Sequence, residues 1–358
     1  MIPILKHNIS LREKNTLRMN VKSKYYMEVN SIFELDQAIR NQMITKEKIM
    51  VLGSGSNILF TKDYPGTILK INIRGIQIVC EEDEYVFVKI GAGEDWSFFV
   101  EYAVSKGWGG IENLAMIPGT VGAAPVQNIA GYGHNLHESL SSVNATIFST
   151  GEKKIFLAEQ CKFGYRTSIF KEDMLGKCAI TDITLKLNKK PDINISYKSR
   201  YESVEEELAK NKIPPYRIED VYQAVVNIRK RKLPDIKEVG TIGSVFKNPL
   251  ITWDQLDAIK KICPDIHYYP QEHLIYKNVT NDNPDKKGRV KIPAAWLIEE
   301  LGWGGKIIGN CAIWKTQPLN IVNLGHATPE EYLSVIKRVK DAVYEKYSID
   351  LETEVVIV

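Results

Sequence analysis

The sequence predicts an α+β fold. Short apolar runs separated by glycine dominate its first half, and helical spacing of apolar residues becomes more frequent after Leu187. Strands are expected at 49–52, 58–60, 68–73, 85–90 and 179–187. A polar, proline-containing stretch follows the last of these strands, which indicates a domain boundary near residue 190.

Helices are expected where a capping residue precedes an amphipathic run. Ser31 with Glu34 has the spacing of a capping box, and Asp95 precedes an apolar run that stops at Gly107. In the second half, further helices are expected around 221–228 and directly after Thr252, Pro293 and Thr328.

Composition excludes several classes of protein. The 358 residues carry 47 Lys and Arg against 44 Asp and Glu, so no strong positive field favours nucleic-acid binding. The five cysteines show no metal-ligand or disulfide spacing, and no apolar run is long enough for a membrane helix. The N-terminus lacks the apolar core of a secretory signal. These features predict a reduced, cytoplasmic protein with no metal site and no nucleic-acid or membrane partner.

A loop rich in small residues joins the strands at 49–52 and 58–60. Its residues are Gly53, Ser54, Gly55, Ser56 and Asn57. Without Cβ atoms in the way, backbone N–H groups of such a loop can approach a pyrophosphate. The third glycine of the Rossmann fingerprint is absent, and a plain tight turn remains the alternative.

The stretch 113–133 contains no charged side chain and is dominated by small residues. One physical reason for such a sequence is that the backbone must lie close to a flat, bulky ligand such as an isoalloxazine ring. The alternative is a buried loop packed on a sheet. Because buried irregular backbone needs hydrogen-bond partners, a cofactor that supplies some of them is the favoured interpretation.

Several polar residues are candidates for chemistry. Arg166 lies between aromatic and apolar residues, where it either pairs with a structural carboxylate or binds an anionic ligand. Ser244 follows paired glycines, although a turn residue is the ordinary interpretation. The basic run 229–232 ends a helix, where it is either solvated or binds a diphosphate. Glu352 and Glu354 are expected on one face of a terminal strand, with Glu354 the better candidate for a buried acid.

Taken in order, these stretches resemble the UDP-N-acetylenolpyruvoylglucosamine reductase family, whose members are UDP-N-acetylmuramate dehydrogenases. The resemblance covers nearly the whole chain. It rests on Asn15–Met19, Gly53–Asn57, Gly91–Glu94, Gly110–Gly122, Pro125–Ile129, Phe163–Arg166, Lys232–Asp235, Gly243–Pro249, Ala294–Ile298 and Leu351–Val355.

The resemblance implies a fold and its division. A vanillyl-alcohol-oxidase (PCMH)-type FAD-binding domain in two α+β subdomains would be followed by a C-terminal α/β substrate-binding domain. The implied segments are subdomains at 1–75 and 76–190, a linker with a substrate lid loop and a helix at 191–232, and the substrate-binding domain at 233–358. The last strand would return to the first subdomain.

It also implies an activity. Members of the family use NADPH to reduce non-covalently bound FAD and then reduce enolpyruvyl UDP-N-acetylglucosamine to UDP-N-acetylmuramate in peptidoglycan precursor synthesis. Hydride passes from flavin N5, and a serine that matches Ser244 donates the proton. A monomer is expected.

By position, Arg166, Ser244 and Glu354 match the family's catalytic trio, in which a raised pKa through burial would let Glu354 act as an acid. The resemblance places the cofactor on the 53–57 loop together with Pro118, Gly119, Thr120, Gly122, Ala123, Asn128 and Gly131. The substrate-binding positions are Tyr132, Tyr197, Arg229, Lys232, Asn248 and Gln317. Tyr197 matches the tyrosine of the additional substrate-covering loop, 191–215 here, that characterises the family's longer subfamily.

Two other functions remain open at this point. One is an FAD-dependent oxidase or dehydrogenase of another small alcohol on the same flavin fold, which the Ser244 and Glu354 motifs disfavour. The other is a non-catalytic protein that binds a UDP-sugar or nucleic acid through residues 229–232.

Overall fold

The chain divides into two compact units that are interleaved in sequence. The computed structural model describes residues 2–44, 48–195, 197, 202–270 and 289–358. The first unit comprises Met1–Ile9, Ser23–Ser54 and Tyr64–Arg229. The second comprises Ser10–Lys22, Gly55–Asp63 and Lys230–Val358. The four-part division expected from the sequence stays a prediction.

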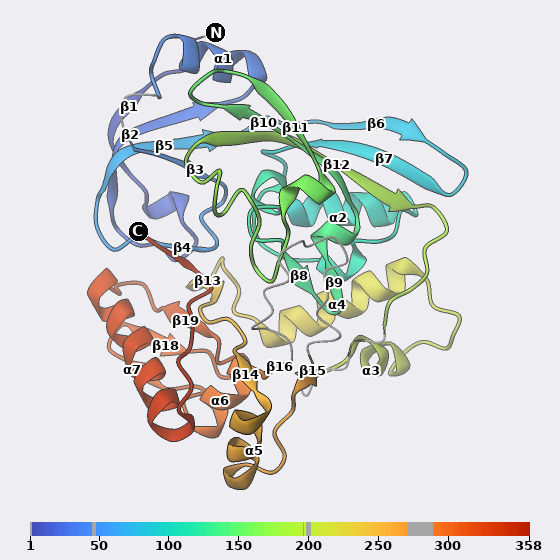
Figure 1. Ribbon diagram of the computed structural model, residues 1–358, viewed down its shortest axis with the longest axis vertical. Coiled ribbons are helices and arrows are strands. Elements are labelled where there is room, and N and C mark those ends of the chain that lie inside the picture. The colour runs from blue at the N-terminus through green and yellow to red at the C-terminus, as the bar shows by residue number, and fades with distance from the viewer. Residues whose placement is uncertain (1, 45–47, 196, 198–201, 271–288) are drawn as a thin grey trace. The chain divides into compact units, whose positions relative to one another are not determined.

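A four-stranded sheet in the order β1-β2-β5-β3 forms the N-terminal part of the first unit (Figure 1). Its strands are β1 (Lys6–Ser10), β2 (Lys22–Val29), β5 (Tyr64–Ile71) and β3 (Ile49–Leu52). Because β2 and β3 both pair with β5 in parallel, a crossover must connect them, and helix α1 (Ile32–Arg40) supplies it. The Ser31 side chain caps this helix by accepting from the Glu34 N–H.

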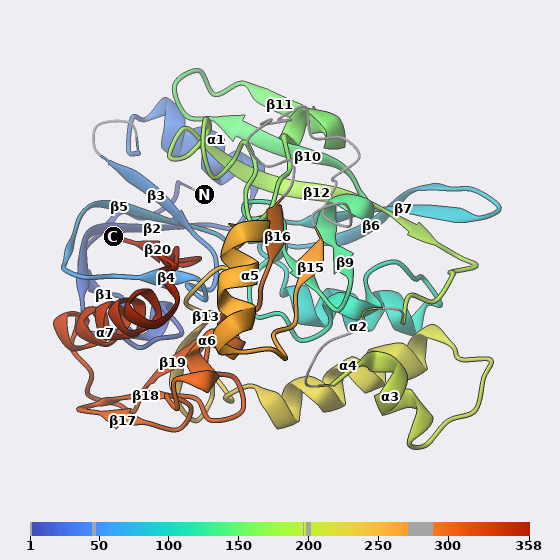
Figure 2. The same ribbon diagram turned by 60° about the horizontal axis from the view of Figure 1, so that its bottom comes forward.

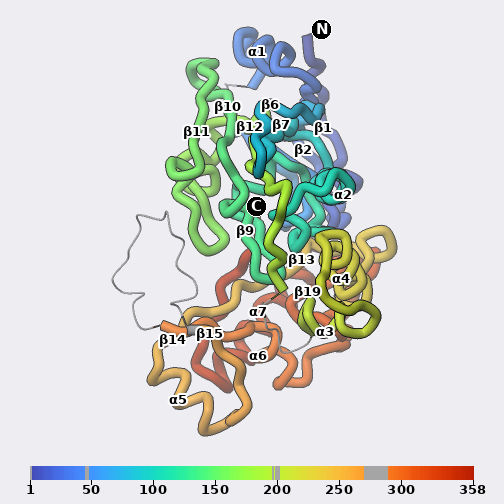
Figure 3. Tube along the Cα trace, turned by 90° about the vertical axis from the view of Figure 1, so that its right-hand side faces the viewer, coloured from blue at the N-terminus to red at the C-terminus, as the bar shows by residue number. Residues whose placement is uncertain are grey.

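The second sheet of this unit is antiparallel throughout, in the order β11-β10-β12-β7-β6. Figure 3 shows β11, β10 and β12 next to one another in this order. Their bounds are β6 (Ile76–Glu81), β7 (Tyr85–Gly91), β10 (Leu140–Ile147), β11 (Lys153–Leu157) and β12 (Cys178–Asn188). Helix α2 (Trp96–Ser105), capped by Asp95, buries Trp96 and Phe99 in the same core.

Much of the chain between α2 and β12 is irregular. It contains the 3-10 turns η2 (Glu112–Leu114), η3 (Val121–Ala123), η4 (Leu136–Glu138) and η5 (Ala158–Cys161), and the short hairpin of β8 (Ala130–Gly131) and β9 (His134–Asn135). After β12, helix α3 (Val204–Ala209) lies beside α4 (Ile218–Lys232) in every view (Figures 1 to 3).

The second unit contains a sheet in the order β13-β19-β18-β17 and a small sheet in the order β14-β16-β15. Their bounds are β13 (Gly240–Ser244), β14 (Leu250–Thr252), β15 (Tyr269–Pro270), β16 (Arg289–Lys291), β17 (Ile307–Ile308), β18 (Cys311–Ile313) and β19 (Asn320–Asn323). The helices are α5 (Trp253–Ile262), α6 (Ala294–Glu300) and α7 (Pro329–Tyr347), visible in Figure 2. Trp296 of α6 and Tyr332 of α7 are among its largest buried side chains.

Two N-terminal segments complete the second unit. Residues 10–22 extend the sheet at β13, because Thr241 donates its N–H to the Thr16 carbonyl and the Thr16 hydroxyl donates to the Thr241 carbonyl. Residues 55–63 contain β4 (Ile58–Leu59), which pairs in parallel with the terminal strand β20 (Val356–Ile357). The chain end is therefore tied to a segment almost 300 residues earlier in sequence.

The expected helices are confirmed, with caps at Ser31, Asp95, Thr252 and Thr328. The expected terminal strand over 351–358 is wrong in part. Only Thr353, in a bridge to Phe246, and β20 are paired as strand. The Glu352 side chain is 72% exposed, whereas Glu354 is only 9% exposed, so of the two carboxylates only Glu354 is buried.

The capping box at the start of α7 offers a test of local stability. The Thr328 hydroxyl accepts from the Glu331 N–H, and the Glu331 carboxylate accepts from the Thr328 N–H. We expect Thr328→Ala to lower the free energy of unfolding by about 1 kcal/mol. Urea denaturation measures it, with Thr328→Ser, which keeps the hydroxyl, as the control. Equal losses in the two variants would contradict a role for the cap.

Candidate active site

The first unit contains a hollow lined by predicted cofactor-binding residues. Gly53, Thr120, Gly122 and Ala123 form part of its wall. The rest of the wall is mainly apolar and comes from β3, β5, β12 and the neighbouring loops, including Val51, Ile71, Val126, Phe170, Met174 and Ile180. The hollow opens to solvent, and its empty space together with that open part amounts to about 600 Å³. Backbone and small side chains thus border an apolar space, as binding of a flat ring requires.

The uncharged segment 113–133 is fixed by hydrogen bonds to α2 and the turn before it. Trp96 donates its indole N–H to the Leu114 carbonyl at 3.0 Å, and the Gly122 N–H donates to the Ala92 carbonyl at 2.9 Å. A Cβ added at Gly122 would lie 2.5 Å from the Ala92 Cβ. Likewise, a Cβ on Gly53 would lie 2.9 Å from the Thr120 hydroxyl oxygen. These glycines let backbone come close on one side of the hollow, so the residues present fit an FAD site.

The other predicted cofactor residues lie in several places. Pro118, Gly119 and Gly131 belong to the same irregular segment. The Asn128 side chain donates to the Gly164 carbonyl at 3.3 Å and accepts from the His137 N–H at 3.1 Å. It therefore tethers this segment to the loop that carries Arg166.

The 53–57 loop is where the chain passes from the first unit to the second. Gly53 and Ser54 belong to the first unit, whereas Gly55, Ser56 and Asn57 belong to the second. Gly55 has a φ of +66°, and a Cβ there would lie 2.5 Å from the Lys14 carbonyl oxygen. Packing within the second unit therefore already requires glycine at position 55.

Three predicted site residues interact electrostatically in the first unit. Burial lowers the pKa of Arg229, the phenol of Tyr132 acts in the opposite direction, and the guanidinium of Arg166 lowers that pKa further. Within the described part of the chain, the Arg229 Nε is buried without a hydrogen-bond partner. Two neighbouring guanidinium groups favour an anionic ligand, because such a ligand offsets both their repulsion and the cost of desolvation.

The second unit gathers another set of predicted residues. Ser244 ends β13, and the next residue, Val245, accepts at its carbonyl from the Glu354 N–H at 2.8 Å. Across the sheet Ser244 pairs with Asn320, whose N–H donates to the Gln317 carbonyl at 2.9 Å. Ser244, Glu354 and Gln317 are thus brought together from positions up to 110 residues apart.

Lys232 and Asn248 also belong to the second unit, and hydrogen bonds connect both of them to other parts of it. The Lys232 carbonyl accepts from the Thr316 hydroxyl at 2.8 Å, beside Gln317. The Asn248 carboxamide oxygen accepts from the Ala294 N–H at 2.9 Å, at the start of α6. The convergence of these residues with Arg166, Arg229 and Tyr132 of the first unit stays a prediction.

Asn320 is a further candidate site residue, which the sequence did not reveal. It faces Ser244 in the antiparallel pair, is 2% exposed, and its carboxamide oxygen has no hydrogen-bond partner among the described residues. Side chains opposite each other in such a pair are neighbours. The sequence feature that could have revealed Asn320 is an amide side chain within the otherwise apolar run 319–322, because a buried strand rarely carries an amide.

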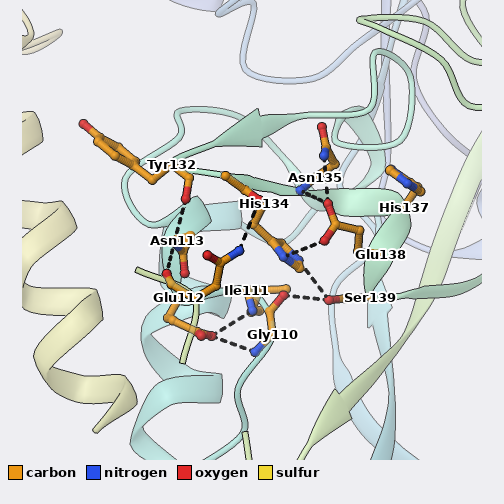
Figure 4. Close-up of polar contacts among 12 residues, drawn as sticks. Gly110, Ile111, Glu112, Asn113, Tyr132, His134, Asn135, His137, Glu138 and Ser139 are labelled. Carbon is orange, nitrogen blue, oxygen red and sulfur yellow. Dashed lines mark hydrogen bonds and ion pairs between the residues drawn. The ribbon is translucent and has the colours of Figure 1, made fainter. Parts of the chain in front are cut away.

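A polar network beside Tyr132, which runs from the buried Ser139 to the exposed Glu138, was also missed (Figure 4). His134 lies 3.3 Å from the Glu138 carboxylate and 3.1 Å from the Ser139 hydroxyl, which donates to the Gly110 carbonyl at 2.6 Å. Burial raises the pKa of Glu138, but the hydrogen bond and charge of His134 and hydrogen bonds from Asn135 outweigh it and lower the pKa to about 2. The network fixes the loop that carries Tyr132.

All five cysteines are free thiols. Among the described residues, no group of three or more His, Cys, Asp or Glu side chains is placed to hold a metal ion. No helix in the described part of the chain has the length and apolarity to cross a membrane.

A family model described as an FAD binding domain matches residues 23–152, which include Gly53 and most of the segment around the hollow. This part of the chain therefore belongs to the class of FAD-binding domains. A second model, described as the UDP-N-acetylenolpyruvoylglucosamine reductase C-terminal domain, matches residues 235–358.

Full-length relatives show the family. The chain is 38% identical to UDP-N-acetylenolpyruvoylglucosamine reductase of Flavobacterium johnsoniae over 354 residues, 99% of each chain. It is 39% identical to the protein of that name from Burkholderia pseudomallei over 347 residues, 96% of this chain and 94% of the relative. The chain belongs to the UDP-N-acetylenolpyruvoylglucosamine reductase family.

A solved structure supports the fold. The reductase of this name from Thermus caldophilus superposes with a TM-score of 0.67 at 22% identity, covering 99% of both chains. The predicted fold class is confirmed as an α+β chain with a vanillyl-alcohol-oxidase-type FAD-binding domain followed by the reductase C-terminal domain.

The network around Glu138 predicts a dependence of stability on pH. Because the folded-state pKa of Glu138, about 2, lies below its ordinary value of 4.5, its contribution is present above pH 4.5 and is lost as the pH falls toward 2. Glu138→Gln should flatten this part of the profile and lower stability at pH 7 by at most about 1 kcal/mol, since the side chain is partly exposed.

Urea denaturation between pH 2 and pH 7 measures this dependence. Ser139→Ala is the control, since it weakens the same network but keeps the carboxylate and therefore keeps the slope. Identical slopes for the wild type and Glu138→Gln would contradict the prediction.

Proposed function

We propose that this chain is an NADPH-dependent flavoenzyme that reduces enolpyruvyl UDP-N-acetylglucosamine to UDP-N-acetylmuramate in peptidoglycan precursor synthesis. The observation that carries the proposal is the placement of Ser244 beside Glu354 in the second unit, through the hydrogen bond between Glu354 and Val245. Full-length similarity to reductases of this name supports the substrate.

The cofactor would be held without a covalent bond by the first unit and the 53–57 loop. Gly53, Thr120, Gly122 and Ala123 border the hollow, and the neighbouring Pro118, Gly119, Asn128 and Gly131 belong to the same cofactor set. Ser54, Gly55, Ser56 and Asn57 complete the set. When bound, FAD supplies hydride transfer from its N5 atom between NADPH and the substrate. The protein fixes the ring plane and excludes water from it.

Arg166 and Arg229 would bind the negative charge of the substrate. Addition of hydride to the vinyl group leaves charge on the neighbouring carbon and its carboxylate, which a fixed guanidinium stabilises. Arg166 has a φ of +57°, and its carbonyl accepts from the Lys171 ammonium at 3.1 Å, so its backbone is held in place. Arg229, whose Nε has no hydrogen-bond partner within the described chain, can bind a carboxylate or phosphate oxygen.

Ser244 would donate the proton that completes the reduction. A serine hydroxyl is a weak acid, but the enolate-like carbon is a strong base, so the transfer is favourable in this direction. Glu354 lies beside Ser244 in the fold and would support the same intermediate. Lys232, Asn248 and Gln317 would bind the nucleotide sugar, together with Tyr132 and Tyr197.

The chain would belong to the longer subfamily, in which Tyr197 closes over the nucleotide. Residues 196 and 198–201 of the proposed lid loop lie outside the described residues. One chain supplies every residue named here, so a monomer suffices. Five free thiols are consistent with the reducing cytoplasm as the place of action.

A stepwise anaerobic titration tests the proposal. Addition of NADPH should bleach the flavin absorbance near its visible maximum, and addition of enolpyruvyl UDP-N-acetylglucosamine should restore it. If the flavin absorbance is instead restored by oxygen, or by an aldehyde or ketone, and not by the UDP-sugar, the protein is an oxidase or dehydrogenase of the same fold.

Replacement of the proposed proton donor should separate the two half-reactions. We expect Ser244→Ala to slow reoxidation of reduced flavin by the UDP-sugar at least about 100-fold while flavin reduction by NADPH stays within about twofold. Stopped-flow absorbance measures both steps. Ser244→Cys, which keeps an acidic proton, should recover part of the rate. Equal loss of both half-reactions in Ser244→Ala would contradict the role of proton donor.

A further inference from the structure

The two tyrosines assigned to the substrate, Tyr132 and Tyr197, lie on segments that a single buried amide connects. Asn113 belongs to η2 and is 2% exposed. Its side-chain nitrogen donates to the Tyr132 carbonyl at 2.8 Å and to the Asn194 carbonyl at 3.0 Å. One carboxamide thus uses both of its N–H groups on two segments that are about 60 residues apart.

A second set of contacts joins the same two segments. The Asn194 side chain donates to the Gly133 carbonyl at 3.3 Å. Gly133 has a φ of +84°, and a Cβ built on it would lie 2.9 Å from the Cβ of Tyr197. The Tyr197 side chain therefore packs directly against a position where no larger residue fits. We call Asn113, Gly133 and Asn194 the amide clasp.

The turn η2, which carries Asn113, is itself held by hydrogen bonds. The carboxylate of Glu112, the residue before Asn113, accepts from the N–H groups of Gly110 at 2.7 Å and Ile111 at 3.0 Å. Gly110 in turn accepts at its carbonyl from Ser139. Glu112 is buried, so these charge-assisted bonds hold η2 rigidly.

Figure 4 shows which part of Tyr132 the amide clasp contacts. The carbonyl of Tyr132 faces the polar network, whereas its phenol ring extends away from it. The amide clasp therefore binds the backbone of Tyr132 and not its ring. Tyr132 also interacts electrostatically with Arg229 of the proposed anion site.

We propose that Asn113 and Gly133 are positioning residues that set the place of Tyr197 relative to Tyr132 before the UDP-sugar binds. The inference rests on the proposed function, because it takes the UDP-sugar as the ligand of both tyrosines. Fixing two ligand contacts in advance removes part of the entropy cost of binding. Loss of the amide clasp therefore weakens affinity for the nucleotide sugar more than it slows the chemical step.

Gly133→Ala tests the contact with Tyr197. The added methyl group must displace Tyr197, so we expect the dissociation constant for UDP-N-acetylglucosamine, measured by calorimetry, to rise at least about tenfold. The KM for the enolpyruvyl substrate should rise by a similar factor, while kcat at saturating substrate stays within about twofold.

Gly107→Ala is the matched control. Gly107 follows α2 in the same unit and has a φ of +74°, but a Cβ there meets nothing within 4 Å. It imposes a similar left-handed strain without touching Tyr197. The midpoint temperature of thermal unfolding should shift about as much in Gly107→Ala as in Gly133→Ala. The dissociation constant of Gly107→Ala for UDP-N-acetylglucosamine should equal that of the wild type.

Asn113→Ala and Asn194→Ala test the contribution of the side-chain amide hydrogen bonds to the affinity for UDP-N-acetylglucosamine. Asn113→Ala should raise the dissociation constant more than Asn194→Ala, because it removes donors to both segments. Since the residues act as one unit, the effect of Asn113→Ala should be smaller when Gly133→Ala is already present. If Asn113→Ala does not fold, Asn194→Ala with Gly133→Ala completes the same cycle.

Failure of the proposed function and failure of the positioning role give different results in these experiments. A wild-type protein that cannot reduce the enolpyruvyl substrate would refute the proposed function. If the wild type is active, equal dissociation constants for Gly133→Ala and Gly107→Ala would overturn the positioning role. So would a fall in kcat by the same factor as the loss of affinity.

Discussion

The first unit depends on the burial of an irregular backbone segment. Residues 113–133 have no long helix or strand to satisfy their N–H and C=O groups, and so each group needs an individual partner. Trp96 provides one at Leu114, Ala92 provides one at Gly122, and the Asn113 side chain provides another at Tyr132. With the backbone held by these partners, the small uncharged residues Gly122 and Ala123 line the hollow.

Residues 113–133 carry no charged side chain, and the charged candidate residues Arg166 and Arg229 lie elsewhere in the first unit. Arg166 and Arg229 interact with each other in the first unit, and the surrounding protein lowers the pKa of Arg229. In the second unit, Ser244 and Glu354 are joined through a single backbone hydrogen bond between strand ends. An apolar space for a ring and separate polar groups for an anion and a proton are the parts that reduction of a charged vinyl ether requires.

Sequence reasoning succeeded where the cause is local. The caps at Ser31, Asp95, Thr252 and Thr328 depend on residues three positions apart, and all four begin the expected helices. The uncharged stretch and the Gly53 loop border a hollow, and their role in cofactor binding stays a prediction. The family resemblance, carried by ordered motifs, supplied the fold class and the candidate residues.

The features that escaped prediction depend on contacts between distant residues. Nothing near Thr16 indicates that its segment pairs with Thr241, and nothing near Ile58 indicates that Val356 pairs with it. The expected terminal strand failed because Glu354 bonds to Val245 while Val356 turns to β4. Asn113 likewise looks like an ordinary turn residue until its two carbonyl partners are known.

Release of the cofactor on denaturation is the most direct test of the central claim that the first unit is built around a flavin. Protein purified without added cofactor should absorb near 450 nm and, after heat denaturation and centrifugation, should release about one FAD per chain into the supernatant. A colourless protein that also takes up no FAD during dialysis, with its fold intact by circular dichroism, would contradict it.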